Sequence, residues 1–392
     1  MDLLSAEECL LIAQRTLSVV EKHNVILVSS QVDDGPGDLM GYMGEYYKLH
    51  LEVKVIGDKK KYFLSYFIKS LPRKNMPQRE ECERKGVFQK ESALYCQLLP
   101  KIQKYATKKL FPKCYHSRND ILVLEDLTQD YRHLKANEVY TLDHYKLVLE
   151  HLSELHAASI AWEEKENVNI YESYKNVLIE LHLDAKNSWY ITGLKAVVFL
   201  AARHPHFQSK KAQSFIQDKL YNILTKAEEL VAPSKDTRNV LCHRDTWDRN
   251  ILYHFDTESS VLPNACCIVD FQLTQYCSPT LDVLFLLYIV ASAKVRKAFY
   301  DECLEHYYKC LRYHLDRLGL DKELITENSF RKECRRTRLA ALLIWKFDYY
   351  LNCDRSELLL RVIKIQPGYE ETIMTPVGEL VEYLMENENL YT

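Results

Sequence analysis

The sequence predicts an α+β fold with two lobes, a small N-terminal lobe built on an antiparallel sheet and a large, mostly helical C-terminal lobe. Segments of strand character are concentrated in residues 24–71, and helical spacing prevails after residue 127. The chain has 392 residues, of which 47% are hydrophobic, and this is enough material for two cores. We therefore expect two lobes.

The elements of the N-terminal lobe follow one another along the chain. A capping-box pattern at Ser5 and Glu8 opens a helix within residues 1–23, which we treat as an N-terminal helical segment. Residues 24–127 then contain strands and one key helix, which carries Glu91, and they end in a connector. The strands are expected at 25–28, 46–55, 62–68 and 120–127.

The rest of the chain, residues 128–392, is expected to form the helical lobe. Apolar residues at helical spacing predict buried helices at 145–159 and 299–318. Short strands interrupt the helices around two polar motifs, so we expect the catalytic and metal-binding residues in this lobe.

Composition excludes several classes of protein. Lys and Arg (52) nearly balance Asp and Glu (55), so no net charge favours nucleic acid or an anionic membrane. None of the 12 cysteines forms a C-x-x-C pair, which favours free thiols in a reducing compartment over a zinc site. No secretory signal is recognised, and the longest apolar stretch, residues 283–293, is too short to span a bilayer. We expect a soluble, cytoplasmic protein without a nucleic-acid, membrane or obligatory protein partner.

The clearest chemical signal lies in residues 241–250. His243, Asp245 and Asn250 fit the pattern H-R-D-x-x-x-x-N, in which the Asp meets the acceptor hydroxyl and the Asn binds metal. Asp and Asn are also common in turns and caps for purely local reasons. The motif therefore needs support from elsewhere in the chain.

A second motif gives that support. The apolar strand of residues 266–269 ends at Asp270, as expected where a core strand presents a metal ligand. Asp270 and Asn250 would supply the few protein oxygens that Mg²⁺ prefers beside phosphate and water. Together the motifs favour phosphoryl transfer from ATP, and with the order of the elements they predict a protein-kinase-like two-lobed fold.

Two charged residues upstream suit the same chemistry. Lys69 stands near the end of the third predicted strand, and Glu91 lies in the helix that follows. A kinase needs a cation at the nucleotide phosphates and a carboxylate that fixes it. The alternative is an exposed Lys at a strand end and an exposed helical Glu, but the downstream motifs favour the ion pair.

The remaining candidate nucleotide-binding residues are weaker. Gly41 and Gly44 belong to a group of glycines between two strands, where backbone N–H groups could approach phosphates. Their spacing does not match G-x-G-x-x-G, and an ordinary flexible hairpin explains them equally well. Glu125 and Leu127 mark the connector, whose backbone would face the adenine edge, although a strand ending in an acidic turn is an equal alternative.

With these residues assembled, the chain resembles the ecdysteroid-kinase-like family, also called CHK-kinase-like, and more distantly the choline kinases and aminoglycoside phosphotransferases. The resemblance extends from about Gly41 to Leu287, and Trp247 and Gln272 are particularly characteristic of it. Other matching blocks are Gly41–Tyr47, Ile68–Pro72, Phe88–Glu91, Val123–Leu127, Leu155–Ser159 and Ser278–Asp282.

The resemblance implies ATP- and Mg²⁺-dependent phosphorylation of a hydroxyl on a small molecule, either an ecdysteroid-like steroid or a hydroxylated or glycosylated xenobiotic. It also implies roles for residues already named: acid/base catalysis by Asp245, Mg²⁺ binding by Asn250 and Asp270, phosphate binding by Lys69 with Glu91 as its partner, and support of the catalytic loop by His243 and Asp282.

One residue departs from the family pattern. Many members have Gly where this chain has Arg244. In protein kinases the corresponding Arg commonly pairs with a phosphorylated activation segment, but here only a short stretch separates Asp270 from Asp282, and no A-P-E follows. The sequence therefore favours a small-molecule acceptor over a protein and leaves the role of Arg244 open.

Two alternatives remain: a choline- or ethanolamine-type kinase, and a catalytically silent kinase-like binding protein. The first would need an aromatic and acidic cage, which no spacing among the tyrosines identifies. The second would not need to retain the complete set of polar residues. Candidate walls of the acceptor pocket are Trp189, Tyr190, Trp345 and Tyr349, which core packing explains at least as well.

Overall fold

The computed structural model describes residues 3–18, 24–35, 43–135, 138–181, 183–184, 188–257, 260–344 and 374–391. The chain divides into two compact units, unit 1 being Met1–Val139 with Asp248–Gln272, and unit 2 being Tyr140–Trp247 with Leu273–Thr392. Asn250 and Asp270 thus belong to unit 1, whereas His243 and Asp245 belong to unit 2. The boundaries expected after residues 23 and 127 stay predictions.

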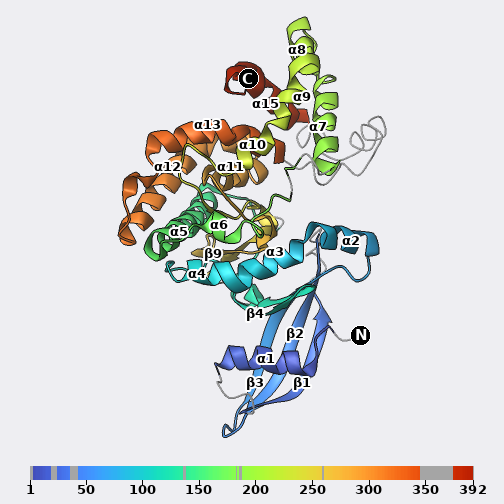
Figure 1. The fold of residues 1–392 in the computed structure, drawn as a ribbon, viewed down its shortest axis with the longest axis vertical. Coiled ribbons are helices and arrows are strands. Elements are labelled where there is room, and N and C mark those ends of the chain that lie inside the picture. The colour runs from blue at the N-terminus through green and yellow to red at the C-terminus, as the bar shows by residue number, and fades with distance from the viewer. Residues whose placement is uncertain are drawn as a thin grey trace. The chain divides into compact units, whose positions relative to one another are not determined.

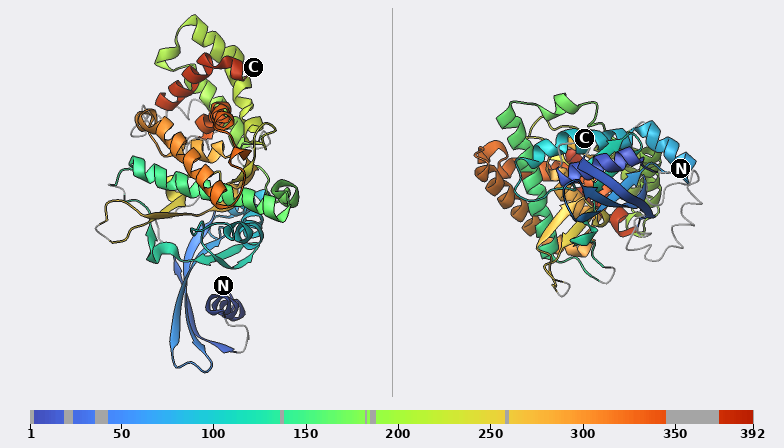
Figure 2. Two further views of the ribbon diagram at one scale, coloured as in Figure 1. Left: turned by 90° about the vertical axis from the view of Figure 1, so that its left-hand side faces the viewer. Right: turned by 90° about the horizontal axis from the view of Figure 1, so that it is seen from below.

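Unit 1 is built on a five-stranded sheet in the order β1-β2-β3-β5-β4, with every neighbouring pair antiparallel. The strands are β1 (Val25–Asp34), β2 (Glu45–Val55), β3 (Lys61–Ser70), β4 (Cys114–Arg118) and β5 (Ile121–Glu125). Along β2 the buried residues alternate as Leu49, Leu51 and Val53, because successive side chains of a strand point to opposite faces. This face packs against helix α1 (Ala6–Leu17) (Figures 1 and 2).

The predicted capping box of α1 is confirmed. The Ser5 hydroxyl accepts a hydrogen bond from the Glu8 amide, and the Glu8 carboxylate accepts one from the Ser5 amide. Arg118 of β4 donates to the same carboxylate at 2.6 Å, which ties α1 to the sheet.

The key helix of unit 1 is a run of three consecutive pieces. They are α3 (Val87–Ala93), the π-helical turn η2 (Leu94–Leu98) and α4 (Leu99–Gln103). Helix α2 (Met76–Lys85) precedes them, and Gly86 ends it in a left-handed conformation with φ of 66°.

A second, three-stranded antiparallel sheet of unit 1 contains residues distant in sequence. Its order is β6-β8-β9, with β6 (Tyr131–Arg132), β8 (Ile251–His254) and β9 (Ala265–Ile268). The connector between β5 and β6 contains the short 3₁₀ turn η3 (Leu127–Gln129). Leu127, Leu252 and Cys267 form a small buried cluster beside this sheet.

Unit 2 is mostly helical. Its α-helices are α5 (Leu142–Glu166), α6 (Ile170–Tyr174), α7 (Ser188–Ala201), α8 (Lys210–Phe215), α9 (Tyr221–Thr225), α10 (Ala227–Val231), α11 (Thr280–Ile289), α12 (Ala293–Arg317), α13 (Glu327–Ile344) and α15 (Thr375–Glu386). Helix α5 packs along α12, and α11 packs on α13 (Figure 1). Two short strands, β7 (Val240–Cys242) and β10 (Gln275–Cys277), pair antiparallel. Strand β7 leads directly into residues 243–250, which we call the catalytic loop after their predicted role.

These two units confirm the predicted α+β class, with an antiparallel sheet in the N-terminal part and a mostly helical C-terminal part. Within the described residues, no helix is both long and apolar enough to cross a membrane.

Candidate active site

Lys69 is the centre of a buried polar cluster in unit 1. Its side chain is 3% exposed, and its Nζ donates to Glu91 Oε2 at 2.7 Å and to Asp270 Oδ1 at 2.8 Å. Gln272 Oε1 accepts a third hydrogen bond at 3.3 Å. We call these four residues the Lys69 cluster; it joins strand β3, helix α3 and the segment that follows β9.

Local packing explains why these side chains meet. Lys69 lies one residue before the end of β3, and α3 is anchored by the buried Val87 and Phe88. The Phe88 ring lies 5.9 Å from Lys69 Nζ. At Gly44, directly before β2, a Cβ atom would lie 3.2 Å from the Ser70 carbonyl oxygen, so the absence of a side chain lets this segment approach the end of β3 closely.

The electrostatics of the cluster keep Lys69 charged. Burial acts to lower the pKa of Lys69, but the carboxylates of Asp270 and Glu91 outweigh it and raise the pKa above its ordinary value. Burial, which outweighs the attraction of Lys69, raises the pKa of Glu91 to about 7. Lys69 therefore presents a fixed positive charge at neutral pH.

The two predicted metal ligands lie at one end of the β8–β9 hairpin. Ile251 pairs with Ile268, so Asn250, which precedes β8, is next to the residues that follow β9. The Val269 amide donates to the Asn250 carbonyl at 3.0 Å, and Asp270 comes directly after. Unit 1 thus brings an amide and a carboxylate side chain to the same end of the hairpin.

Asp270 has a special backbone conformation. Its φ is 66°, in the left-handed region that Asp tolerates better than most residues. The following Phe271 is buried edge-on against Tyr95 and Phe111, with ring centroids 5.7 and 5.5 Å away. The Asp270 side chain keeps 17% exposure, so an ion or ligand can reach it from solvent.

The connector after β5 is fixed by Asp126, which sequence analysis did not assign a role. Its carboxylate accepts hydrogen bonds from Ser65 at 2.7 Å, from Lys48 at 3.2 Å and from the Thr128 amide at 3.0 Å. Glu125 pairs with Lys109 through its side chain, and the Leu127 side chain is buried. The predicted contact of this backbone with adenine stays a prediction.

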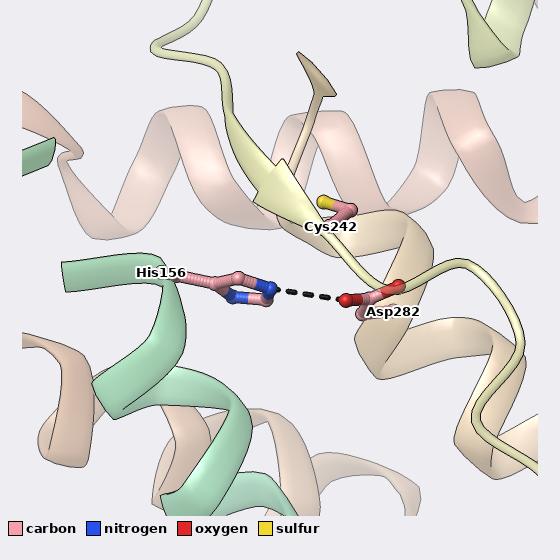
Figure 3. Close-up of side chains that lie close together, drawn as sticks. All are labelled: His156, Cys242 and Asp282. Carbon is pink, nitrogen blue, oxygen red and sulfur yellow. Dashed lines mark hydrogen bonds and ion pairs between the residues drawn. The ribbon is translucent and has the colours of Figure 1, made fainter. Parts of the chain in front are cut away.

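In unit 2, Asp282 of α11 holds the start of the catalytic loop. Its fully buried carboxylate accepts from the His243 amide and the Arg244 amide, both at 2.7 Å, and from His156 Nε2 of α5 at 3.1 Å (Figure 3). His156 Nδ1 shares a hydrogen bond of 2.7 Å with the Tyr307 hydroxyl of α12. We call His156, Asp282 and Tyr307 the Asp282 network.

Burial acts to raise the pKa of Asp282, but hydrogen bonding and charge from His156, with His243 and the Arg244 amide, lower it below its ordinary value. The Cys242 thiol lies beside the His156–Asp282 pair, with ligand atoms of all three within 4.8 Å of one another (Figure 3). Because the Asp282 oxygens already accept hydrogen bonds from the loop, we assign this group to loop support rather than to metal binding.

The loop itself turns sharply after His243. The Asp245 amide donates to His243 Nδ1 at 3.2 Å, and the Trp247 amide donates to the Asp245 carbonyl at 3.1 Å. Asp245 is half-buried, in contrast to the fully buried His243. Its backbone is thus fixed within the loop.

Arg244 adopts a left-handed conformation with φ of 70°, which is unusual for a long side chain. Its guanidinium is buried, donates to Glu180 Oε2 at 3.3 Å and lies 5.2 Å from the centre of the Phe285 ring. Arg244 thus connects the catalytic loop to the segment that follows α6.

Residues 38–320 of the chain match the ecdysteroid kinase-like family. The chain belongs to this family. Comparison with curated proteins gave no significant match. Family membership confirms the predicted resemblance and makes the chain a phosphotransferase that acts on hydroxyl groups, a small-molecule kinase.

Solved structures of antibiotic phosphotransferases are similar at low identity. A spectinomycin phosphotransferase, APH(9)-Ia, in complex with ADP and spectinomycin is 12% identical, with 91% of this chain and 94% of that chain covered and a TM-score of 0.42. The gentamicin complex of APH(2″)-IIa is 15% identical, with coverages of 99% and 98% and a TM-score of 0.40. The macrolide 2′-phosphotransferase MphH from Brachybacterium faecium is 12% identical, with coverages of 93% and 98% and a TM-score of 0.39. Because these TM-scores are low, the assignment of the chain to a family of kinases rests on the family match alone.

For this ecdysteroid kinase-like protein, the structure brings Lys69 into contact with both Glu91 and Asp270. It places the Asn250 backbone next to Val269, the residue before Asp270. Their catalytic and binding roles stay predictions. Gly41 lies outside the described residues.

Of the four candidate wall residues of the acceptor pocket, Tyr190 has a described side chain. Trp345 and Tyr349 lie outside the described residues, as does the side chain of Trp189. Tyr190 is buried within unit 2 and donates to the Leu224 carbonyl at 3.3 Å, as expected of a packing residue.

Sequence reasoning missed the direct contact of Gln272 with Lys69, although it singled out Gln272 as characteristic of the family. It also missed His156 as the partner of Asp282. The signal for His156 in the sequence was its place in the block Leu155–Ser159, which matches the family. In the structure this block contacts the strand that leads into the catalytic loop, because Ser159 Oγ accepts a hydrogen bond from the Leu241 amide at 3.1 Å.

Proposed function

We propose that the protein transfers the γ-phosphoryl group of ATP to a hydroxyl of an ecdysteroid-like steroid or of a hydroxylated or glycosylated xenobiotic. The observation that carries this proposal is the Lys69 cluster, in which a buried cation is fixed between the carboxylates of Glu91 and Asp270. Such an arrangement suits a ligand with clustered negative charge and a divalent cation.

The residues present fit ATP and Mg²⁺. Mg²⁺ prefers oxygen ligands and usually takes one or two from the protein, and Asp270 and Asn250 offer a carboxylate and an amide oxygen at one end of the hairpin. The partial exposure of Asp270 leaves it accessible to such an ion. When bound, ATP would supply the phosphoryl group, and Mg²⁺ would neutralise the charge of its phosphates.

Lys69 would bind the phosphates as a positioned point charge. Because Asp270 and Glu91 raise its pKa, it stays protonated over the whole physiological range. Glu91 would not touch the nucleotide; it would keep the ammonium group at the position where the phosphates arrive. In other kinases, too, a lysine binds the phosphates and a carboxylate positions the lysine, and most of the catalysis comes from positioning and electrostatics.

Asp245 would orient the acceptor hydroxyl and take up its proton. Asp245 is half-buried, and its backbone is fixed by His243 and, through the loop amides, by Asp282. As the acceptor oxygen bonds to phosphorus, its proton would pass to a carboxylate oxygen of Asp245. General acid/base assistance of this kind contributes about 10²- to 10⁴-fold to the rate.

The test is ATP-dependent phosphorylation of a panel of hydroxylated steroids and plant glycosides, detected as the mass gain of one phosphoryl group. Choline and ethanolamine belong in the panel, because their turnover would support a choline-type kinase instead. We expect Asp245→Asn to retain the fold and ATP binding but to lose at least about 100-fold in turnover.

The matched control is Asp301→Asn, which makes the same chemical change on an exposed position of α12 and is expected to keep full activity. Near-normal turnover by Asp245→Asn would refute its assignment. Absence of nucleotide binding and of ATP turnover by the wild-type protein would support a silent binding protein.

A further inference from the structure

Two cysteines of unit 1 lie close together on different elements. Cys96 belongs to the π-helical turn η2 and Cys114 begins strand β4, and these two elements pack together. A bulge between Cys114 and His116 puts Cys114, opposite Leu124, on the same face of β4 as Ser117, opposite Leu122. The Cys96 sulfur also lies 3.0 Å from Ser117 Oγ, which accepts a hydrogen bond from Ser92 Oγ at 2.9 Å.

The surroundings of Cys96 favour its thiolate form. Helix α1 brings Arg15 to this place, where its guanidinium donates to the carbonyl of Tyr115, the residue after Cys114, at 2.6 Å. The neighbouring Cys114 side chain, whose effect outweighs burial, lowers the pKa of Cys96 to about 6, with help from Ser117 and Arg15. The thiolate is the form of cysteine that reacts with oxidants.

Exposure distinguishes Cys96 from the other cysteines that the structure describes. Cys96 is exposed, whereas the rest are buried or half-buried. Cys114 is half-buried. A reactive, accessible thiol next to a second, sheltered thiol is the arrangement found in proteins that oxidise to a disulfide.

We propose that Cys96 and Cys114 are a peroxide-sensitive pair that oxidises to a disulfide and fastens η2 to β4. In the first step the Cys96 thiolate attacks one oxygen of a hydroperoxide, the O–O bond breaks, and the sulfenic acid of Cys96 forms as water or an alcohol leaves. In the second step the Cys114 sulfur attacks the sulfenic sulfur; its proton and the sulfenic hydroxyl leave as water. One peroxide is reduced for each disulfide formed.

The disulfide would act on the helical run that carries Glu91. In that run, Tyr95 of η2 packs edge-on against Phe271, which follows Asp270. A covalent link between Cys96 and Cys114 would thus hold this run to the sheet at one point. The modification itself does not depend on the function proposed above.

The experiment treats the wild-type protein with about one equivalent of hydrogen peroxide, blocks remaining thiols and maps the peptides by mass spectrometry. We expect a crosslink between the peptides of Cys96 and Cys114 that dithiothreitol reverses. We also expect the melting temperature to rise by about 2 °C or more, because the link shortens the unfolded chain.

Three variants separate the steps. Cys114→Ser should stop at the sulfenic acid of Cys96, which dimedone captures, and Cys96→Ser should leave Cys114 reduced. Cys310→Ser removes a half-buried thiol of unit 2 and should behave as wild type. Oxidation of Cys96 in the wild-type protein without a crosslink to Cys114, or equal oxidation of Cys114 in Cys96→Ser, would overturn the proposal.

Discussion

Replacing Asp282 by asparagine tests whether one buried carboxylate holds the catalytic loop. The side chain of Asp282 has no exposed surface, and its two oxygens accept three hydrogen bonds, from the amides of His243 and Arg244 and from His156. Asparagine has the same shape, but one of its two terminal atoms is a donor. In either orientation at least one N–H of the loop would face another N–H.

The expected change in the free energy of unfolding follows from these hydrogen bonds. Leaving a buried donor without an acceptor costs about 1–3 kcal/mol, and the remaining hydrogen bonds lose the contribution of the negative charge. We therefore expect Asp282→Asn to lower the free energy of unfolding by about 3 kcal/mol, with a fall in melting temperature of about 4 °C. Turnover should fall as well, since the same amides fix the backbone of Asp245.

The loss of stability in Asp282→Asn should depend on pH. The pKa of Asp282 is lower in the folded chain than in the unfolded chain, so the unfolded state binds the proton more readily. The contribution of the carboxylate is present in full above the ordinary aspartate pKa of about 4, and it is lost as the pH falls through the lower folded-state value. The stability difference between wild type and Asp282→Asn should therefore shrink below about pH 4.

The assay is thermal and urea unfolding followed by tryptophan fluorescence between about pH 3 and 7, with Asp301→Asn as the control for the same chemical change on an exposed helix position. A loss below about 0.5 kcal/mol at pH 7 would refute the reasoning, because that is the size expected of an ordinary surface substitution. A difference that stays constant down to the lowest pH would refute the assignment of the effect to the carboxylate charge.

Three further predictions concern the other charged contacts. Glu91→Gln should raise the KM for ATP at least about tenfold with little change in melting temperature, because Lys69 keeps Asp270 as a partner; an unchanged KM would contradict the role of Glu91. Asp270→Ala should remove the magnesium-dependent part of the thermal stabilisation by ATP, which reaches about 2.7 kcal/mol at a ligand concentration 100 times the Kd; an unchanged magnesium response would contradict metal binding there. Glu180→Gln should destabilise the protein by about 2 kcal/mol, more than Arg244→Gly, because the former leaves a buried guanidinium without its carboxylate; the reverse order in melting temperature would contradict this.

Much of this arrangement is predictable from local patterns in the sequence. Alternating apolar residues predict the strands of the N-terminal sheet, and a capping box predicts the start of α1. The place of Lys69 near a strand end and of Glu91 in a helix after it predicts their ion pair, and their Nζ and Oε2 atoms lie 2.7 Å apart. Such patterns work because strand and helix periodicity are properties of neighbouring residues.

Contacts between distant segments were not predictable in the same way. Gln272 reaches Lys69, and His156 reaches Asp282, across long stretches of chain. The same holds for the closeness of Cys96 and Cys114, because neither cysteine belongs to a recognisable motif. Each of these pairs depends on the packing of whole elements, such as η2 on β4, and a single sequence carries no direct record of that packing.

Arg244 shows how a local pattern can suggest the wrong partner. Its position in the loop resembles the arginine with which protein kinases bind a phosphorylated segment, yet its buried guanidinium pairs with Glu180 inside unit 2. The left-handed backbone at this position explains why glycine suits other members of the family, since a residue with a Cβ atom loses about 1–2 kcal/mol there. The ion pair with Glu180 and the contact with Phe285 offset this loss. The arginine is thus a structural link between the catalytic loop and the segment after α6, and its charge is already neutralised within the protein.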